Sequence, residues 1–394
     1  MRDEPPAQWP VALPQDETKS HATRVLEGRT LDKVLGGAAQ EQAPEVARVT
    51  IALESGQSGE GFYFITPTRR GDWEFGDISA RYNSPLGLWH RQFRRKAATR
   101  VRVYPDTEEV RRYELLLRQG RLRDIGLHIL RLRGRGTEFE TLRDYSRDDE
   151  YRDVNWKASA RLGKMVVNNY QIERDQTIII ALDCGRMMTA MAHFSGASAT
   201  GSEEKTPLSK LDCAINATVL LSHVAASMGD AVGLLLFSDE VQTFIPPRKG
   251  RVQTGRIIEA MYGAQPTLVE PDYQAAYQHL LSRRLRRALI ITFTDLIDPQ
   301  ASAELLSASG ALRRHHNALC VTINNRDVLE MAEAMPEHSA ELYRKAMAQR
   351  MLSHRARALE ELRRNGVGIL DVDAAALTVA AVNRYLDLKA RAAL

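Results

Sequence analysis

The chain has 394 residues, of which 44% are hydrophobic, and its 54 basic and 50 acidic residues give a formal net charge of +4. This hydrophobic content excludes a disordered protein, and the length allows two domains, each with a core of its own. A net charge this small for the size gives no strong general attraction to nucleic acid or to anionic membranes.

Three cysteines, Cys184, Cys213 and Cys320, lie far apart in the sequence and show no metal-ligand spacing. Together with the odd count, this favours unpaired thiols in a reducing compartment. No stretch approaches the roughly 18 consecutive apolar residues of a membrane-spanning helix. The opening residues are too acidic and proline-rich for a signal peptide. As written, the chain is expected in the cytoplasm.

The first part of the chain predicts little regular structure and then short strands. Residues 1–60 are rich in Pro, Gly, Ala and Gln, with one clear strand candidate at 47–53. Alternation from residue 61 predicts short antiparallel strands, so 61–105 is expected to form a small β-rich domain that ends with a strand over 98–104. Residues 106–176 are predicted to be a helical and polar connector.

Many arginines in residues 90–135 form a basic belt. Aromatic side chains on which bases could stack are sparse in this belt, so the sequence does not favour nucleic-acid binding there. A solvated face near a membrane surface or a domain joint is the preferred interpretation.

From residue 177 the pattern changes to alternating strands and helices. Strand candidates are 177–182, 231–237, 288–293, 319–323 and 368–371. Helix candidates are 208–228, 250–262, 272–284, 301–315, about 328–364, and 374–390. This alternation predicts an α/β domain over 177–394, with a parallel sheet covered by helices on both faces. Ligands of such sheets bind beyond the carboxyl ends of the strands.

A dense polar segment precedes the first of these strands. It contains Leu142-Arg143-Asp144-Tyr145, Asp148-Asp149 and Val154-Asn155-Trp156-Lys157-Ala158-Ser159-Ala160-Arg161, and Glu173-Arg174-Asp175 then leads into a strand that ends in Asp183. The pattern resembles the signature of the domain-of-unknown-function-58 (DUF58) family, apart from Arg147, where relatives commonly carry glycine. Members are bacterial and archaeal proteins with a von Willebrand factor A-like domain, and they are often encoded beside MoxR-type AAA+ ATPases.

The resemblance covers the chain from about residue 62 onward and implies a membrane anchor. Relatives typically begin with two membrane-spanning helices followed by a β-rich domain, whereas this chain begins as if in the middle of that domain. We therefore expect a truncated N-terminus, and a missing anchor there would associate the protein with the inner membrane.

Trp156 has two interpretations. Tyr145, Tyr151, Val154 and Trp156 interleave with the charges, which favours an ordered connector over a solvated segment. Trp156 either anchors this connector against the sheet or forms part of a partner-binding site with Arg152 and Arg161, because Trp and Arg are favoured at interface centres.

The resemblance also implies a degenerate metal-ion-dependent adhesion site. Such a site combines Asp-x-Ser-x-Ser after the first strand, a Thr from a second loop and an Asp after a later strand. Asp183 and Asp295 match the two aspartates, but Gly185 and Met187 replace the serines, and Asp272 stands at the second loop. Either Asp183, Asp272 and Asp295 hold Mg²⁺, or no cofactor binds and Asp183 and Asp295 cap loops or helix N-termini.

The predicted function is that of a non-enzymatic adaptor or scaffold. No P-loop is present, so the chain is not itself a P-loop ATPase. The resemblance implies action with a MoxR-type AAA+ ATPase in protein maturation or complex assembly, with Asp183, Arg152, Trp156 and Arg161 contacting the partner; the client proteins are unidentified. Two alternatives are a metal-assisted hydrolase at the same edge, for which no general base is identifiable, and a nucleic-acid-binding module using residues 90–135.

Overall fold

The computed structural model describes most of the chain from residue 57 onward. Residues 208–390 are described except for 284, 297–298 and 337; residues 138–192 except for 147–150, 152–153 and 172–175; and residues 57–115 with several short gaps. Before residue 57, only 2–3, 11–12, 47–49 and 51 are described. The chain divides into two compact units, Met1–Tyr104 and Pro105–Leu394.

The first unit consists of short antiparallel strands. They are β1 (Arg2–Asp3), β2 (Val11–Ala12), β3 (Ala47–Arg48), β4 (Phe64–Ile65), β5 (Gly71–Phe75), β6 (Ile78–Asn83), β7 (His90–Arg95) and β8 (Thr99–Val103). β6 pairs with β7 and β5 with β8, both antiparallel. The antiparallel strands predicted from residue 61 are thus confirmed, including the one predicted over 98–104.

The signature segment forms a hairpin that carries a helix. β9 (Glu138–Asp144) pairs antiparallel with β10 (Val166–Gln171), and α2 (Trp156–Leu162) lies between them in sequence. Asn155 caps α2 by accepting a hydrogen bond from the Ala158 amide at 3.0 Å, and Gly163 ends it with a φ of 66°. The sequence predicted order in this segment, but not its two strands.

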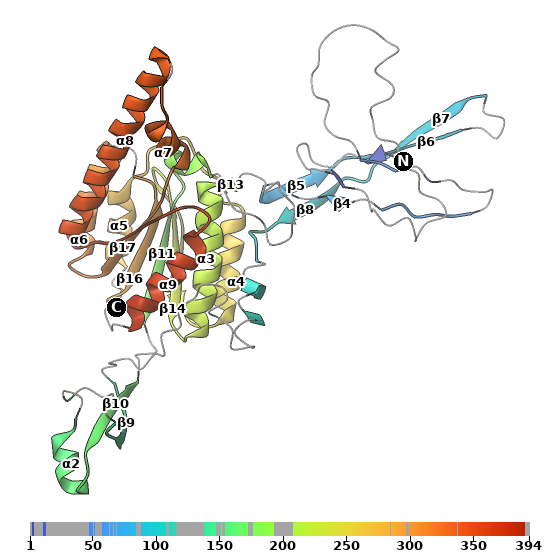
Figure 1. Ribbon diagram of the computed structural model, residues 1–394. Helices are drawn as coiled ribbons and strands as arrows, with labels where there is room; N and C mark the ends of the chain where they lie inside the picture. The colour runs from blue at the N-terminus through green and yellow to red at the C-terminus, as the bar shows by residue number, and fades with distance from the viewer. Residues whose placement is uncertain are drawn as a thin grey trace. The chain divides into compact units, whose positions relative to one another are not determined.

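The rest of the second unit is an α/β domain (Figure 1). Its strands are β11 (Thr177–Asp183), β12 (Met191–Ala192), β13 (Leu208–Ser209), β14 (Ala231–Phe237), β15 (Val241–Arg248), β16 (Leu289–Thr294), β17 (Asn317–Ile323) and β18 (Gly368–Val372). Its helices are the 3₁₀ helix η3 (Arg186–Thr189) and the α-helices α3 (Lys210–Ser227), α4 (Arg251–Tyr262), α5 (Tyr273–Ser282), α6 (Pro299–Leu312), α7 (Arg326–Glu333), α8 (Ser339–Arg364) and α9 (Leu377–Ala390).

A six-stranded sheet forms the centre of this domain, in the order β15-β14-β11-β16-β17-β18. All neighbours are parallel except β14 and β15. Ile178, Ile180 and Leu182 of β11 pack in one core with α3, α4 and α9, while Ile179 and Ala181 pack in the other with α5, α6 and α8. Because both faces are covered, β11 is apolar without alternation. The predicted fold class is confirmed.

The order of the strands determines where a binding site can form. From β11 the chain passes through α3 to β14 on one side, whereas β16 lies on the other side of β11. The chain therefore leaves the carboxyl ends of β11 and β16 toward opposite sides, and open α/β sheets bind ligands at such a switch point. Asp183 ends β11 and Asp295 follows β16.

Two differences from the predicted elements have simple causes. β15 was not predicted because Pro246 and Pro247 interrupt its strand pattern, and the structure places it at the edge of the sheet, where proline is tolerated. The single long helix predicted over 328–364 is wrong. Pro336, which lacks a backbone N–H, lies between α7 and α8 and separates them.

Among the described residues, no helix combines the length and the apolar composition needed to cross a bilayer.

Candidate binding site at the carboxyl edge of the sheet

Asp183 is enclosed at the end of β11, with an exposed fraction of 0%. The register that pairs Leu182 with Phe293 brings Thr294 next to Asp183. The Asp183 carboxyl accepts hydrogen bonds from the Gly185 amide at 2.7 Å, the Thr294 hydroxyl at 2.7 Å and the Tyr273 hydroxyl at 3.2 Å. Asp183 therefore joins β11, β16 and α5, and it has no surface with which to contact a partner directly as predicted.

Burial raises the pKa of the Asp183 carboxyl to about 6, and the nearby Asp295 carboxylate acts in the same direction. Hydrogen bonds from Thr294, Gly185 and Tyr273 favour the ionised form and offset part of this effect. The group therefore titrates close to neutral pH.

Asp295 lies in a network of buried ion pairs. Its carboxylate is bonded to Lys210 of α3 and to Arg355 of α8. Arg355 also donates to Asp371 of β18 at 2.7 Å and to the Thr322 hydroxyl at 3.1 Å. We call Lys210, Asp295, Arg355 and Asp371 the edge ion-pair network. It connects two helices, which lie on opposite faces of the sheet, to the carboxyl ends of the strands.

Local structure positions Lys210 for this contact. Ser209 and Asp212 form a capping box at the start of α3, with the Asp212 amide donating to the Ser209 hydroxyl oxygen at 3.1 Å. This cap makes Lys210 the first residue of α3, and its side chain is only 1% exposed.

The first two loops of this edge are in direct contact. A Cβ added to Gly185 would lie 2.9 Å from the Val269 carbonyl oxygen and 3.0 Å from the nearest Asp183 oxygen, so a serine at this position would not fit without movement. Thr267, which precedes Asp272, donates through both its amide and its hydroxyl to the Cys184 carbonyl oxygen, at 2.7 and 3.1 Å.

The structure does not bring Asp272 together with Asp183 and Asp295 as a set of metal ligands. Asp272 caps α5, and its carboxylate accepts a hydrogen bond from the Ala275 amide at 2.8 Å. Over the described part of the chain, no group of three or more His, Cys, Asp and Glu side chains is placed to hold a metal ion. The residues present therefore do not fit the divalent metal that the resemblance implies.

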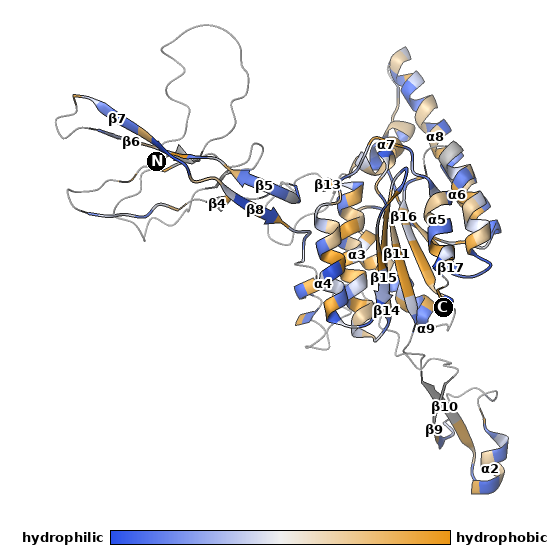
Figure 2. Ribbon diagram, turned by 180° about the vertical axis from the view of Figure 1, so that it is seen from behind, coloured by the Kyte–Doolittle hydropathy of each residue, from blue (hydrophilic) through white to orange (hydrophobic). Residues whose placement is uncertain are grey.

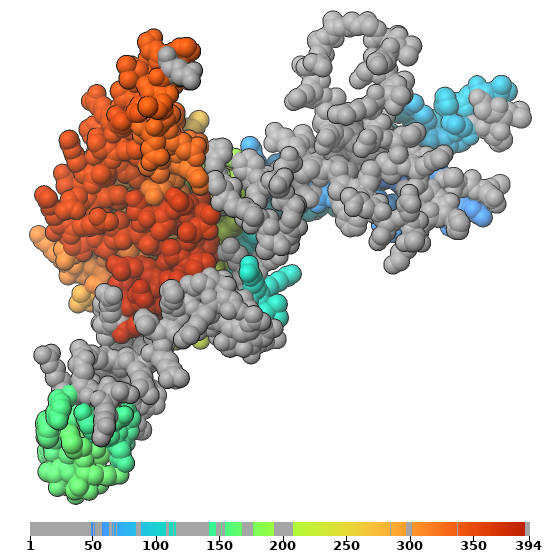
Figure 3. Space-filling view, viewed as in Figure 1, coloured from blue at the N-terminus to red at the C-terminus, as the bar shows by residue number. Residues whose placement is uncertain are grey.

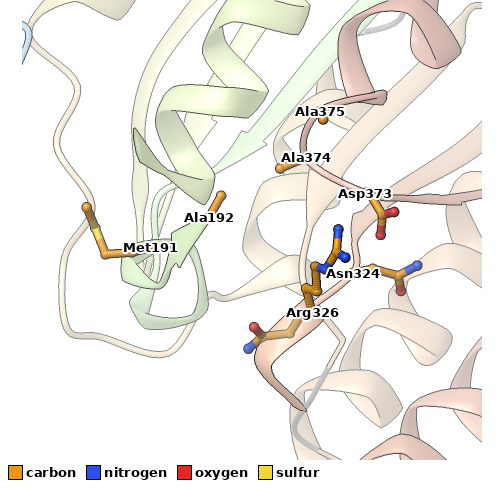
Figure 4. A pocket seen from close by; sticks show the side chains of 8 residues that line it. Met191, Ala192, Asn324, Arg326, Asp373, Ala374 and Ala375 are labelled. Atoms are coloured by element: carbon orange, nitrogen blue, oxygen red, sulfur yellow. The ribbon is translucent and has the colours of Figure 1, made fainter. Parts of the chain in front are cut away.

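A small pocket of about 50 Å³ lies beyond the carboxyl ends of β17 and β18. Figure 4 shows the side chains of Asn324, Arg326 and Asp373 along one part of its wall, with Met191 and Ala192 opposite them. The volume suits a few water molecules rather than a cofactor.

Two of the predicted partner residues in the signature segment, Trp156 and Arg161, are exposed. Trp156 begins α2 with 61% of its surface exposed, and both interpretations of this residue stay predictions. Arg161 is exposed in the last turn of α2, and Arg152 lies outside the described residues. A partner-binding role for these three residues stays a prediction.

The charged groups of the edge ion-pair network are engaged with one another. Each member of the edge ion-pair network is bonded to an opposite charge, so none of the four is free to act as a general base. Burial raises the pKa of the nearby Cys320 thiol to about 12, which makes it a poor nucleophile.

Sequence reasoning identified Asp183 and Asp295 but missed Tyr273, Lys210 and Arg355. The capping pattern of Ser209 and Asp212 indicates where α3 begins and hence that Lys210 lies near the strand ends. No sequence signal connects Arg355 with Asp295, because 60 residues separate them and the contact forms only when α8 packs on the sheet.

A family model and several solved structures match this chain. The family model described as "Protein of unknown function DUF58" matches residues 141–339, just over half of the chain. Among solved structures, the VWA domain of SpRpn10 has a TM-score of 0.31 and 11% identity, covering 53% of this chain and 94% of that one. The conserved hypothetical protein BatB from Bacteroides thetaiotaomicron has a TM-score of 0.32 and 14% identity, covering 55% of this chain and 99% of that one.

An aerotolerance-related membrane protein from Bacteroides fragilis gives a TM-score of 0.29 at 15% identity, covering 54% of this chain and 98% of that one. A comparison with curated proteins gave no match. The match to the family model covers the signature segment and most of the α/β domain. On that match, the chain belongs to the DUF58 family.

Proposed function

We propose that this protein is a non-enzymatic adaptor that binds a MoxR-type AAA+ ATPase through the carboxyl edge of its sheet and acts in protein maturation or complex assembly. One observation carries the proposal: exposed apolar side chains stand on α7 and α8 beside the edge ion-pair network, whose charged groups are paired with one another. Such an edge suits the binding of another protein better than a reaction.

The N-terminal part of α8 provides the exposed surface that the proposal uses. Arg355 fixes α8 at the edge through Asp295, and residues 339–354 precede it. At 1.5 Å per residue, this part is about 24 Å long. It projects past the end of the sheet in Figure 1 and forms a ridge above the rest of the α/β domain in Figure 3.

Large apolar side chains on α7, on α8 and between them are exposed to solvent. Met335 is 87% exposed, Tyr343 69% and Leu342 58%, and Met331 and Met347 are more than 40% exposed. Hydrophobic and hydrophilic residues alternate along α8 (Figure 2). Clustered exposed apolar residues rimmed by polar ones are typical of protein interaction sites.

The choice of partner rests on family membership. DUF58 proteins are often encoded beside MoxR-type ATPases, and the ATPase would supply the energy that this chain does not generate. The proposal places the complex in the cytoplasm or at the inner membrane. The client proteins are not identified.

A pull-down with surface variants tests this proposal. The tagged protein is purified from its native cells with Mg²⁺ and ATP, and co-purified proteins are identified by mass spectrometry. The double variant Leu342→Asp/Tyr343→Asp should recover at least about tenfold less AAA+ ATPase than the wild type, because it places charges in the apolar contact.

The control is Ala356→Asp, which places one negative charge at an exposed position near the C-terminal end of α8. It should recover as much ATPase as the wild type. Absence of any AAA+ ATPase from the wild-type sample would refute the partnership, and equal recovery with the double variant would refute the surface.

A further inference from the structure

We infer that Lys210 and Arg355 supply the positive charge that a divalent metal would supply at this edge, so that the edge is complete without a metal ion. The inference concerns the internal chemistry of the edge and holds whether or not the proposed ATPase partner is correct.

The carboxylate oxygens offer the first argument. A hard divalent cation needs oxygen ligands with free lone pairs that converge from several loops. One oxygen of Asp295 is bonded to Lys210 and the other to Arg355. Asp183 accepts three hydrogen bonds from Gly185, Thr294 and Tyr273. Both carboxylates are therefore already satisfied by groups of this chain.

The space between the loops offers the second argument. Gly185 approaches the Val269 carbonyl so closely that even a Cβ would meet it at 2.9 Å. The Thr267 hydroxyl, four residues before Pro271, which stands at the expected threonine position, donates to the Cys184 carbonyl oxygen. The first and second loops thus bond to each other where the metal site would need oxygens from both.

The charge balance offers the third argument. Lys210 and Arg355 carry two positive charges, and Asp295 and Asp371 carry two negative charges. The side chains of Lys210 and Asp295 are 1% and 0% exposed, so water screens this pair poorly. A divalent cation would add two positive charges to a neutral network and would be repelled by both basic groups.

Metal titration of the wild type and of Lys210→Ala tests the inference. We expect the wild type to show the same melting temperature in Mn²⁺ and in excess chelator, and no bound Mn²⁺ by electron paramagnetic resonance. In Lys210→Ala, one oxygen of Asp295 loses its buried partner, so the melting temperature should fall by about 10 °C. Mn²⁺ should restore part of this loss.

Two further variants keep the test decisive. Lys210→Ala/Asp295→Asn lacks the freed carboxylate and should not respond to Mn²⁺. Arg355→Ala frees the other oxygen of Asp295 and provides a second route if Lys210→Ala does not fold. Wild-type protein that binds Mn²⁺ and loses it on Asp295→Asn would overturn the inference. Folded Lys210→Ala and Arg355→Ala that both ignore Mn²⁺ would also overturn it.

Discussion

The enclosed Asp183 carboxyl makes stability depend on pH. Burial raises its pKa to about 6, from about 3.8 in an unfolded chain, so the folded state binds the proton more tightly. Its contribution to the unfolding free energy is therefore fully present below pH 3.8 and is lost as the pH rises through 6. The difference between the two pKa values corresponds to about 3 kcal/mol.

Asp183→Asn removes this titration. The unfolding free energy of the wild type relative to Asp183→Asn should fall by about 2 kcal/mol between pH 4 and pH 7. Urea denaturation followed by circular dichroism at 222 nm measures it, because most of the described helices belong to the α/β domain. Asp239→Asn removes an exposed carboxyl as a control. A pH-independent difference between wild type and Asp183→Asn would contradict the assignment.

Single residues show how far the sequence predicts this site. The resemblance to an adhesion-site motif identified Asp183 and Asp295. Both follow apolar strands, and the end of an apolar run can be recognised in a sequence. The partners of these aspartates were not predictable in the same way: Lys210 and Arg355 are 85 and 60 residues from Asp295. In sequence, Arg355 is one of several charges on α8, and only packing shows that it is buried.

The last helix is fixed at the opposite edge of the sheet by a second buried ion pair. Lys389 of α9 donates to Asp230 at 2.6 Å, and the two side chains are 1% and 0% exposed. Tyr385 of α9 also donates to Asp230, which precedes β14. These contacts, together with its apolar packing, attach α9 to the start of the sheet.

Lys389→Ala should lower the unfolding free energy by about 3 to 5 kcal/mol, because it leaves the Asp230 carboxylate buried without its charged partner. Arg364→Ala is the matched control, since it breaks an exposed pair with Glu360 on α8. The control should cost less than about 1 kcal/mol. Urea denaturation measures both changes. Equal losses of unfolding free energy in the two variants would show that the buried ion pair stabilises the protein no more than the exposed one.

Elements differ in how well the sequence predicts them. The five strands of the parallel sheet were predicted within a few residues, because burial on both faces leaves an uninterrupted apolar run. β15 was missed, since Pro246 and Pro247 signal a loop unless the strand is known to lie at an edge. Pro336 indicates the break between α7 and α8, but the helical spacing of apolar residues on both sides of it led to the prediction of one continuous helix.

At the scale of the whole molecule, the balance of 54 basic and 50 acidic residues argues against nucleic-acid binding. The basic strand β7 is exposed along its length, but Arg94 on it already pairs with Asp77 at 3.0 Å. We expect a dissociation constant weaker than about 1 µM for a duplex DNA at 150 mM salt, measured by fluorescence anisotropy.

Repeating that measurement at several salt concentrations provides the control. Tight binding that weakens steeply with salt, and that Arg91→Glu/Arg95→Glu abolishes, would favour the nucleic-acid-binding alternative.

Arg355 divides α8 into two arms of unequal length. The arm outside the sheet edge, residues 339–354, is about 24 Å long, and the arm inside it, residues 356–364, is about 13 Å. Arg355, bonded to Asp295 and Asp371, connects both arms to the strand ends. A protein bound at Leu342 or Tyr343 would therefore contact the same helix that Arg355 fixes to the carboxyl ends of β16 and β18.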